Sequence, residues 1–375
     1  MEKIEKIAEH FSFQGKLLGI EENNQGNINK TYILTYEDNG IKRKYLIQKI
    51  NANVFREPLL VMRNIELVTE HIKKKLEETG DTVHKTLNII KTVDGENLYV
   101  FINRDGEKEY YRAFDYIDNC ISYDSLSESD NPMKLAYEVG KSFGLFQRLL
   151  SDFPANMLGE TIKDFHNVNK RFNDLLLSIE NKVTNRAFRY SEEIIDLISM
   201  IKECSIIANS LGKSIPIRVT HNDTKLNNIL VDKDTGIGVA LIDLDTVMPG
   251  SSLFDLGDGI RSACSNSFED ETDLNKVYLN LELTKAYLDG YLEEMADYLT
   301  KDEITYIGAS IKILTYELAT RFLTDYINGD VYFKVKYKEH NADRFMNQYI
   351  LLKDIDSKLG EINRYVRKRA INHRH

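Results

Sequence analysis

Cysteine is scarce in this chain, which has three in 375 residues, Cys120, Cys204 and Cys264. They lie far apart and form no Cys-x-x-Cys pair, so we expect neither a disulfide framework nor a structural zinc site. The chain also lacks an apolar run long enough to cross a bilayer, and its charged N-terminus lacks the apolar core of a signal peptide. These absences predict a cytoplasmic protein that does not enter a membrane.

An excess of positive charge is absent as well. The sequence has 49 Lys and Arg against 59 Asp and Glu, a net charge of −10. Nucleic-acid binding needs a basic surface, so we expect no nucleic-acid partner. A hydrophobic content of 42% and a charged content of 29% are typical of a globular protein. The length suffices for two lobes, each with its own core.

Two common phosphate-binding loops are missing. The sequence contains no G-x-x-x-x-G-K-[ST] motif and no Gly-x-Gly-x-x-Gly. The polar stretch 23–29 holds a single glycine, Gly26. By itself this stretch indicates a hairpin turn; its place between the first two predicted strands would put it over the phosphates of ATP in a kinase.

The chemistry gathers in the segment 219–244, VTHNDTKLNNILVDKDTGIGVALIDL. His221, Asp223 and Asn228 match the kinase catalytic loop H-x-D-x(4)-N, in which Asp is the base and Asn binds metal. Asp243 ends the second strand of the hairpin that follows, where a kinase places a Mg²⁺ ligand. The motif alone is weak, but the hairpin at the expected distance makes it specific. The hairpin strands are expected at 228–231 and 239–243.

The N-terminal third follows the element order of a kinase nucleotide lobe. Lys49 lies on the third strand, where a kinase lysine contacts the α- and β-phosphates of ATP. Its expected partner is a carboxylate on the next helix, and Glu66 and Glu70 both qualify. Alternatively, Lys49 is an ordinary solvated strand lysine. Strands are expected at 16–20, 30–36, 44–50, 98–104 and 109–114, with a helix at 58–78.

The stretch 110–119 leads out of the fifth strand. In a kinase this connector passes adenine, and we expect backbone groups of about Asp115 to Ile117 to bind it. We predict an α+β bilobal protein-kinase-like fold, with a nucleotide lobe over 1–118, a hinge at about 114–118 and a mainly helical lobe over 119–375. Helices in the second lobe are expected at 132–150, 192–211, 274–294, 301–325 and 345–369.

Three further residues are candidates for lesser roles. His166 lies in a stretch expected to be irregular, where a lone histidine is more often structural than a substrate contact. Asp255 and Asp258 lie near a helix start, where we expect them to stabilise the helix and brace the catalytic loop.

Several segments resemble a known family. HNDTKLNNIL, LIDLDTVMPG and FDLGDGIR are similar to motifs of the aminoglycoside phosphotransferase/choline kinase superfamily, with the N-acetylhexosamine 1-kinases most similar. YLIQKINANVF, VMRNIELVTEHI, ETIKDFHNVNKRF, TRFLTDYINGDVYFKV and HNADRFMNQ extend the resemblance over nearly the whole chain.

The resemblance implies ATP- and Mg²⁺-dependent phosphorylation of the anomeric hydroxyl of GlcNAc or GalNAc. It implies that Asp223 is the base and that Asn228 and Asp243 bind Mg²⁺. It also implies that the sugar is held at three positions, Arg321, Tyr332 and Ile28. Where the family has a phenylalanine against the sugar, this chain has Ser262.

Alternatives remain for these residues and for the function. Arg321 could instead pair with Glu317 one helical turn away, and Tyr332 could be a core aromatic. The same fold could act on another small alcohol, such as an aminoglycoside, choline or a different sugar. A nucleotide-binding protein without turnover is disfavoured by the intact Asp223, Asn228 and Asp243. The lack of an A-P-E segment and of a long activation loop disfavours a regulatory protein kinase.

Overall fold

The computed structural model describes residues 2–23 and 28–373 of the chain, with side chains as far as residue 371. The strands of the first third form one antiparallel sheet in the order β1-β2-β3-β6-β4, with β5 beside β6. The strands are β1 (Lys16–Asn23), β2 (Lys30–Asp38), β3 (Ile41–Ile50), β4 (Ile89–Ile90), β5 (Tyr99–Ile102) and β6 (Lys108–Asp115).

The two faces of this sheet carry different helices because side chains alternate along each strand. Tyr45 and Ile47 of β3 pack in a core with Ile4 and Ile7 of α1 (Glu2–Ala8). Ile50 faces the other side and packs with the apolar face of α2 (Pro58–Thr79). Whether a β3 residue has an odd or an even number therefore decides which helix its side chain contacts.

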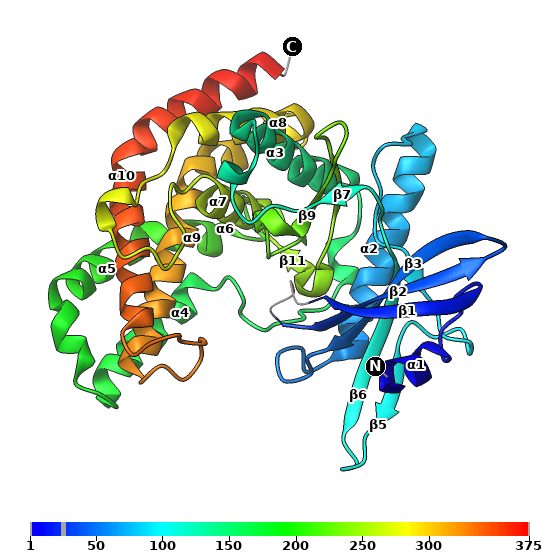
Figure 1. Ribbon diagram of the computed structural model, residues 1–375. Coiled ribbons are helices and arrows are strands. Elements are labelled where there is room, and N and C mark those ends of the chain that lie inside the picture. Colours follow the sequence, from blue (N-terminus) through cyan, green and yellow to red (C-terminus); the bar gives the residue numbers. More distant parts are fainter. Residues whose placement is uncertain (1, 24–27, 374–375) are drawn as a thin grey trace.

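The second lobe is mainly helical and lies beside the sheet in Figure 1. The α+β bilobal kinase-like fold predicted from the sequence is confirmed. Its short 3-10 helices are η1 (Leu126–Glu128), η2 (Ala155–Met157), η3 (Arg186–Tyr190), η4 (Leu226–Asn228), η5 (Leu244–Thr246) and η6 (Leu274–Lys276). Its other elements are β7 (Cys120–Ile121), α3 (Pro132–Leu149), α4 (Val168–Asn181), α5 (Ser191–Cys204), α6 (Ile206–Ser210), β8 (Arg218–Thr220), β9 (Ile229–Asp232), β10 (Gly238–Leu241), β11 (Met248–Gly250), α7 (Ser252–Ala263), α8 (Leu281–Met295), α9 (Lys301–Ile327) and α10 (His340–His373).

Some predicted boundaries in this lobe are wrong. The helix expected at 192–211 is divided into α5 and α6, which meet at Ser205. The helix expected from residue 274 begins as α8 at Leu281, because Asn280 caps it by accepting the N–H groups of Glu282 and Leu283. Helix α4, capped by the Asn167 side chain, occupies a stretch for which we predicted no helix.

The buried apolar residues do not divide simply by lobe. The apolar face of α2, including Ile65, Val68 and Ile72, belongs to the same buried cluster as Phe146 and Leu149 of α3. Only the sheet face beneath α1 forms a core of its own. Helix α2 therefore binds the two lobes together through apolar packing.

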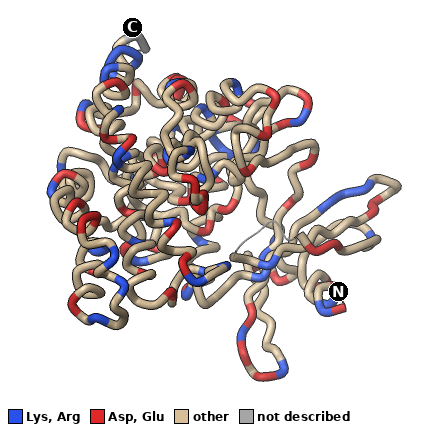
Figure 2. Tube along the Cα trace, turned by 60° about the vertical axis from the view of Figure 1, so that its left-hand side comes forward, with Lys and Arg blue, Asp and Glu red and all other residues tan. Residues whose placement is uncertain are grey.

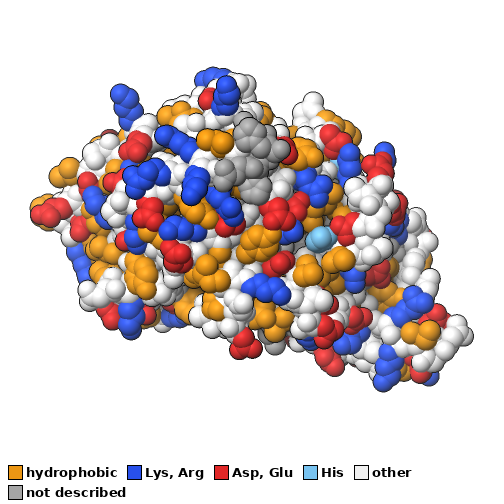
Figure 3. Space-filling model, turned by 90° about the horizontal axis from the view of Figure 1, so that it is seen from above, with side chains coloured by type: hydrophobic (Ala, Val, Ile, Leu, Met, Phe, Trp, Pro, Cys, Tyr) orange, Lys and Arg blue, Asp and Glu red, His pale blue; other side chains and the backbone are white. Residues whose placement is uncertain are grey.

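The surface mixes both signs of charge. Lys and Arg positions are interspersed with Asp and Glu positions along both lobes in Figure 2, and apolar side chains are scattered among charged ones on the face seen in Figure 3. Within the described ranges, we find no helix with the length and apolar content that a membrane span requires.

Candidate active site

The catalytic segment is held from beneath by one buried carboxylate. Asp255, 1% exposed at the start of α7, accepts the backbone N–H groups of His221 and Asn222, both at 2.8 Å. It also accepts Gln147 Nε2 of α3 at 2.8 Å. These bonds hold Asn222 in a left-handed conformation with φ of 63°. The bracing role predicted for Asp255 thus has a direct structural counterpart.

His221 links the catalytic loop to the hairpin. The side chain is fully buried against Phe143 and Phe146. Its Nε2 lies 3.0 Å from the carbonyl oxygen of Ile242, and its Nδ1 accepts the N–H of Asp223 at 3.3 Å. The tautomer with its proton on Nε2 satisfies both bonds. His221 therefore ties the loop that carries Asp223 to the strand end that carries Asp243.

Asp223 is surrounded by donors. Asn228 Nδ2 donates to its backbone oxygen at 2.8 Å and to Oδ2 at 3.1 Å. Lys225 Nζ lies 2.9 Å from Oδ1 and 3.0 Å from Oδ2. The carboxylate is 17% exposed, so it is oriented from two sides and still reachable. Sequence reasoning placed Asp223 and Asn228 together, as observed, but missed Lys225.

Asp243 lies at the start of η5 with φ of 59°, a left-handed conformation that is costly for a residue other than glycine. Displacement of water by the surrounding protein, followed by the negative charges of Asp245 and Asp223, raises the pKa of Asp243 to about 7. The two carboxylates predicted to serve one site are thus close enough to repel each other. A divalent cation placed between them would relieve that repulsion.

The available oxygens fit magnesium. The Nδ2 of Asn228 is directed at Asp223, which leaves its amide oxygen for a metal. Among residues 2–23 and 28–373, no cluster of three or more His, Cys, Asp or Glu side chains is suited to a metal. Mg²⁺ commonly takes one or two protein oxygens and completes its shell with phosphate and water. Asn228 and Asp243 match that pattern.

The role of Lys49 at the ATP phosphates stays a prediction. Lys49 shares the α1 face of β3 with Ile47 and pairs with Glu109 of β6 at 2.8 Å. The predicted pairing with Glu66 or Glu70 is wrong; Glu66 pairs with Lys91 at 3.3 Å instead.

Arg112 of β6 is the cation on the opposite face of the sheet. It is 2% exposed, and its guanidinium binds Asp245 and donates to Gln48 Oε1 at 3.0 Å. Gln48 is opposite Arg112 in the β3–β6 register. A charged residue at this parity on β6 was the signal in the sequence that could have identified Arg112.

The roles predicted for Asp115 and Ile117 at adenine, and for Ile28 at the sugar, stay predictions. The N–H of Asp115 donates to the carbonyl oxygen of Asn88 at 3.0 Å, so of the Asp115 backbone groups it is the carbonyl oxygen that would bind adenine. Ile117 lies between β6 and β7. Ile28 is 41% exposed just before β2. Gly26 lies outside the described residues.

Arg321 and Tyr332 come together. The Arg321 guanidinium carbon lies 5.9 Å from the ring centre of Tyr332 and 5.4 Å from that of Phe333. Tyr332 is 72% exposed, so it is not a core aromatic. Glu317, offered as an alternative partner for Arg321, is instead 3.3 Å from His166 Nδ1 and 3.8 Å from Arg171 Nε.

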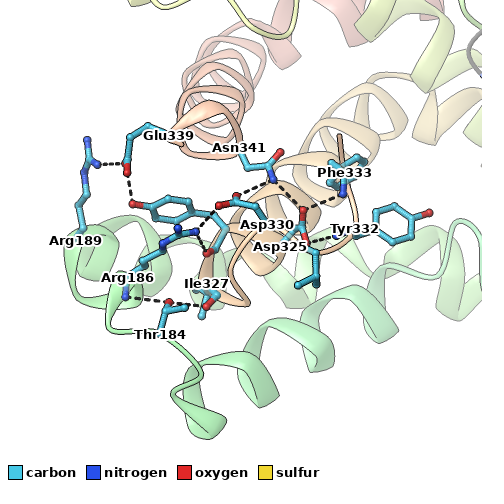
Figure 4. A network of polar contacts seen from close by, with 12 residues as sticks. Thr184, Arg186, Arg189, Asp325, Ile327, Asp330, Tyr332, Phe333, Glu339 and Asn341 are labelled. Atoms are coloured by element: carbon cyan, nitrogen blue, oxygen red, sulfur yellow. Dashed lines mark hydrogen bonds and ion pairs between the residues drawn. The ribbon is translucent and has the colours of Figure 1, made fainter. Parts of the chain in front are cut away.

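The loop that carries Tyr332 is pinned by buried Asp325 near the end of α9 (Figure 4). Its carboxylate accepts the backbone N–H groups of Val331, Tyr332 and Phe333 at 2.8 to 3.0 Å. Asn341 Nδ2 of α10 donates to the same carboxylate at 2.9 Å. The ring of Tyr332 is thereby presented at the surface by a backbone that is held in place.

His166 lies between this region and the catalytic loop. Burial alone would lower its pKa, but the carboxylate of Glu317 raises the pKa of His166 overall. His166 also lines a cavity of about 280 Å³ together with Asn222, Met248 and Phe254. Asp258 pairs with Arg261 at 2.9 Å. Ser262, on the same helix, donates its hydroxyl to the carbonyl oxygen of Gly259.

In this bilobal fold an aspartate and an asparagine lie on one loop, and a buried histidine ties that loop to the segment before a second aspartate, an arrangement typical of a kinase-like phosphotransferase. The model of the phosphotransferase enzyme family matches residues 19–298. The chain belongs to this family, which confirms the superfamily predicted from the motifs.

Solved structures of similar fold include a microcompartment-associated aminopropanol kinase, at 13% identity and a TM-score of 0.61, covering 96% of this chain and 98% of that one. A spectinomycin phosphotransferase in complex with ADP and spectinomycin matches at 11% identity and a TM-score of 0.58, covering 96% and 98%. A choline kinase from Cryptosporidium parvum Iowa II matches at 13% identity and a TM-score of 0.57, covering 97% and 99%. At such identities the likeness concerns the fold alone.

Proposed function

We propose that this protein transfers the γ-phosphoryl group of ATP to the anomeric hydroxyl of an N-acetylhexosamine, giving the sugar 1-phosphate and ADP. The observation that carries the proposal is the arrangement around Asp223, a reachable carboxylate oriented by Asn228 and Lys225. Nucleotide use is supported by the spectinomycin phosphotransferase of the same fold, which was solved with ADP.

In this mechanism Asp223 accepts a hydrogen bond from the acceptor hydroxyl and aligns its oxygen with the γ-phosphorus. A new O–P bond forms as the bond to the β-phosphate bridging oxygen breaks, and the hydroxyl proton passes to Asp223. Lys225 holds positive charge beside the carboxylate, where the transferred group acquires its negative charge. Asn228 and Asp243 would hold Mg²⁺, which neutralises charge on the phosphates.

The acceptor side favours a neutral, oxygen-rich molecule. Arg321 presents planar donors next to the exposed ring of Tyr332. Burial lowers the pKa of Arg171, and the nearby charge of Arg321 lowers it in addition. Glu317 and Asp174 lie within 4 Å of Arg171, whereas no carboxylate of the described residues pairs with Arg321, so the Arg321 charge repels an ammonium group. This charge pattern disfavours choline or an aminoglycoside as the acceptor and supports hydroxyls and an N-acetyl oxygen.

The test is an acceptor panel with ATP and Mg²⁺: GlcNAc, GalNAc, galactose, choline and kanamycin, followed by phosphorus NMR. We expect product from an N-acetylhexosamine, with the phosphorus coupled to the anomeric proton. Product from kanamycin or choline alone would leave the phosphotransferase assignment standing and overturn the sugar. ATP turnover with none of these acceptors would also count against the sugar.

A further inference from the structure

One stretch of the second lobe, residues 245–247, is bonded by side chains from three separate places in the first lobe. Asp245 is 1% exposed; its Oδ2 accepts Asn29 Nδ2 at 2.6 Å, and its Oδ1 binds the guanidinium of Arg112. Two residues further on, the carbonyl oxygen of Val247 accepts Asn64 Nδ2 of α2 at 2.8 Å. Because Asp243 lies two residues before Asp245, these three bonds fix the position of the proposed metal ligand relative to the sheet.

Of these three side chains, that of Asn29 belongs to the stretch 23–29, which is expected to lie over the ATP phosphates. Asn29 directly precedes β2, and its Oδ1 accepts the N–H of Asn51, just after β3, at 3.0 Å. Its side chain therefore spans from the end of β3 to a buried carboxylate of the other lobe. A hydrogen bond to an ionised, buried acceptor is among the stronger ones in proteins.

We infer that Asn29 is a positioning residue for the nucleotide: by bonding Asp245 it holds the chain that enters β2 against the segment carrying Asp243. This role rests on the proposed function, in which the ATP phosphates lie between those two segments. Without the bond, the chain before β2 has to be ordered when nucleotide binds, and that cost weakens binding. Asn29 acts through Asp245, not on the reacting atoms.

The two partners can be exchanged. Asn29→Asp alone places two carboxylates where a 2.6 Å hydrogen bond now lies. Asp245→Asn alone leaves one oxygen for two donors, so its amide N–H must face either Asn29 or Arg112, and it removes the charge partner of Arg112. The double variant Asn29→Asp/Asp245→Asn restores one donor and one acceptor with their roles exchanged, and Asp at position 29 can still accept the N–H of Asn51.

The measurement is the dissociation constant for MgADP by titration calorimetry, without an acceptor. We expect each single variant to bind MgADP about tenfold more weakly, as for loss of a hydrogen bond to a charged group, and the double variant to recover most of that loss. Asn103→Asp is the matched control, since Asn103 bonds only within the turn between β5 and β6 in the described structure. Asn29→Ala, which adds no charge, gives the same comparison should Asn29→Asp fail to fold.

The outcomes separate this role from the proposed function. If the wild type binds MgADP and both Asn29→Asp and Asn29→Ala bind it equally well, the role of Asn29 is overturned and the proposed function is not. A double variant as weak as the two single losses combined also overturns it, because the pair would then not be coupled. No MgADP binding by the wild type overturns the proposed function and this role together.

Discussion

At the scale of single residues, surroundings separate side chains of the same type. Asp243 and Asp245 are two positions apart, yet Asp245 is buried, paired with Arg112 and hydrogen-bonded by Asn29, whereas Asp243 has a left-handed backbone and feels the charges of two neighbouring carboxylates. The first is suited to holding the lobes and the second to binding a cation. A carboxylate beside other carboxylates gains more from a bound cation than one that is already paired with an arginine.

Asp223→Asn tests the base. We expect kcat to fall by about 100-fold to 10,000-fold, because an amide cannot take the hydroxyl proton. MgADP affinity and thermal stability should stay near those of the wild type, since Asp223 is partly exposed and asparagine has nearly the same size and shape. Steady-state rates and calorimetry measure both.

Asp105→Asn, in the exposed turn between β5 and β6, is the control for this change. An Asp223→Asn enzyme with an undiminished kcat would remove Asp223 from the chemistry.

At the scale of elements, strand parity and loop anchoring decide which side chains reach a site. Lys49 falls on the α1 face of the sheet and Arg112 on the α2 face, one residue apart in the β3–β6 register. Successive side chains of a strand point to opposite faces of the sheet, so a shift of one residue places a cation in the other environment. On the acceptor side, Asp325 supplies the anchor for the loop that carries Tyr332.

Asp325→Ala should release that loop. Three backbone N–H groups and Asn341 would lose their acceptor, so the loop should become mobile and the acceptor KM should rise by about tenfold or more. The KM for ATP should change little, because Asp325 lies on α9, in the other lobe from the sheet. Steady-state kinetics with each substrate varied separate the two.

Asp302→Ala, in the first turn of the same helix, is the matched control. Equal rises in both KM values for Asp325→Ala would argue for a general loss of structure instead.

Glu109→Gln tests the ion cluster beneath α1. Burial opposes ionisation, but hydrogen bonds from Lys3, Lys49 and Tyr111 lower the pKa of Glu109 from 4.5 to about 2. The native state therefore binds this proton less readily than the unfolded chain, so the stabilisation is complete above pH 4.5 and is lost as pH falls toward 2. We expect Glu109→Gln to cost about 1 kcal/mol at neutral pH, allowing for screening of the exposed lysines, and less as the solution is acidified.

Urea unfolding of both proteins at several pH values measures this difference, with Glu5→Gln on the exposed face of α1 as control. A difference that grows on acidification would reverse the sign and contradict the ionised Glu109.

At the scale of the whole molecule, the lobes are joined more firmly than a hinge alone would join them. Helix α2 belongs by sequence to the first lobe but shares its core with α3 of the second. The bonds of Asp245 and Asn64 add polar contacts across the same boundary. The segments that unfold together should therefore be those that share a core, and not those that are neighbours in the sequence.

Native-state hydrogen exchange in urea tests this division. We expect peptides from the buried face of α2, residues 61–76, to open together with α9 of the second lobe. Peptides from β1 and β2 should open at lower free energy, because they depend on the smaller core beneath α1. Exchange of α2 together with β1 and β2 would show instead that the first lobe unfolds as one unit.

The sequence by itself determined the catalytic hairpin and the order of the elements. His221, Asp223, Asn228 and Asp243 lie within one short segment, where spacing and alternating apolar residues constrain the geometry locally. The same local reasoning placed Asp255 beneath the loop.

Only the tertiary structure decided which distant side chains meet. Glu109 with Lys49, Arg112 and Asn29 with Asp245, and Glu317 with His166 are pairs far apart in the chain. Such pairs depend on strand register, on parity and on how the lobes dock, and several carboxylates were equally eligible from spacing alone. The sequence gives the charged residues, but the packing of the folded chain determines which of them pair, because a buried charge is stable only beside the group that compensates it.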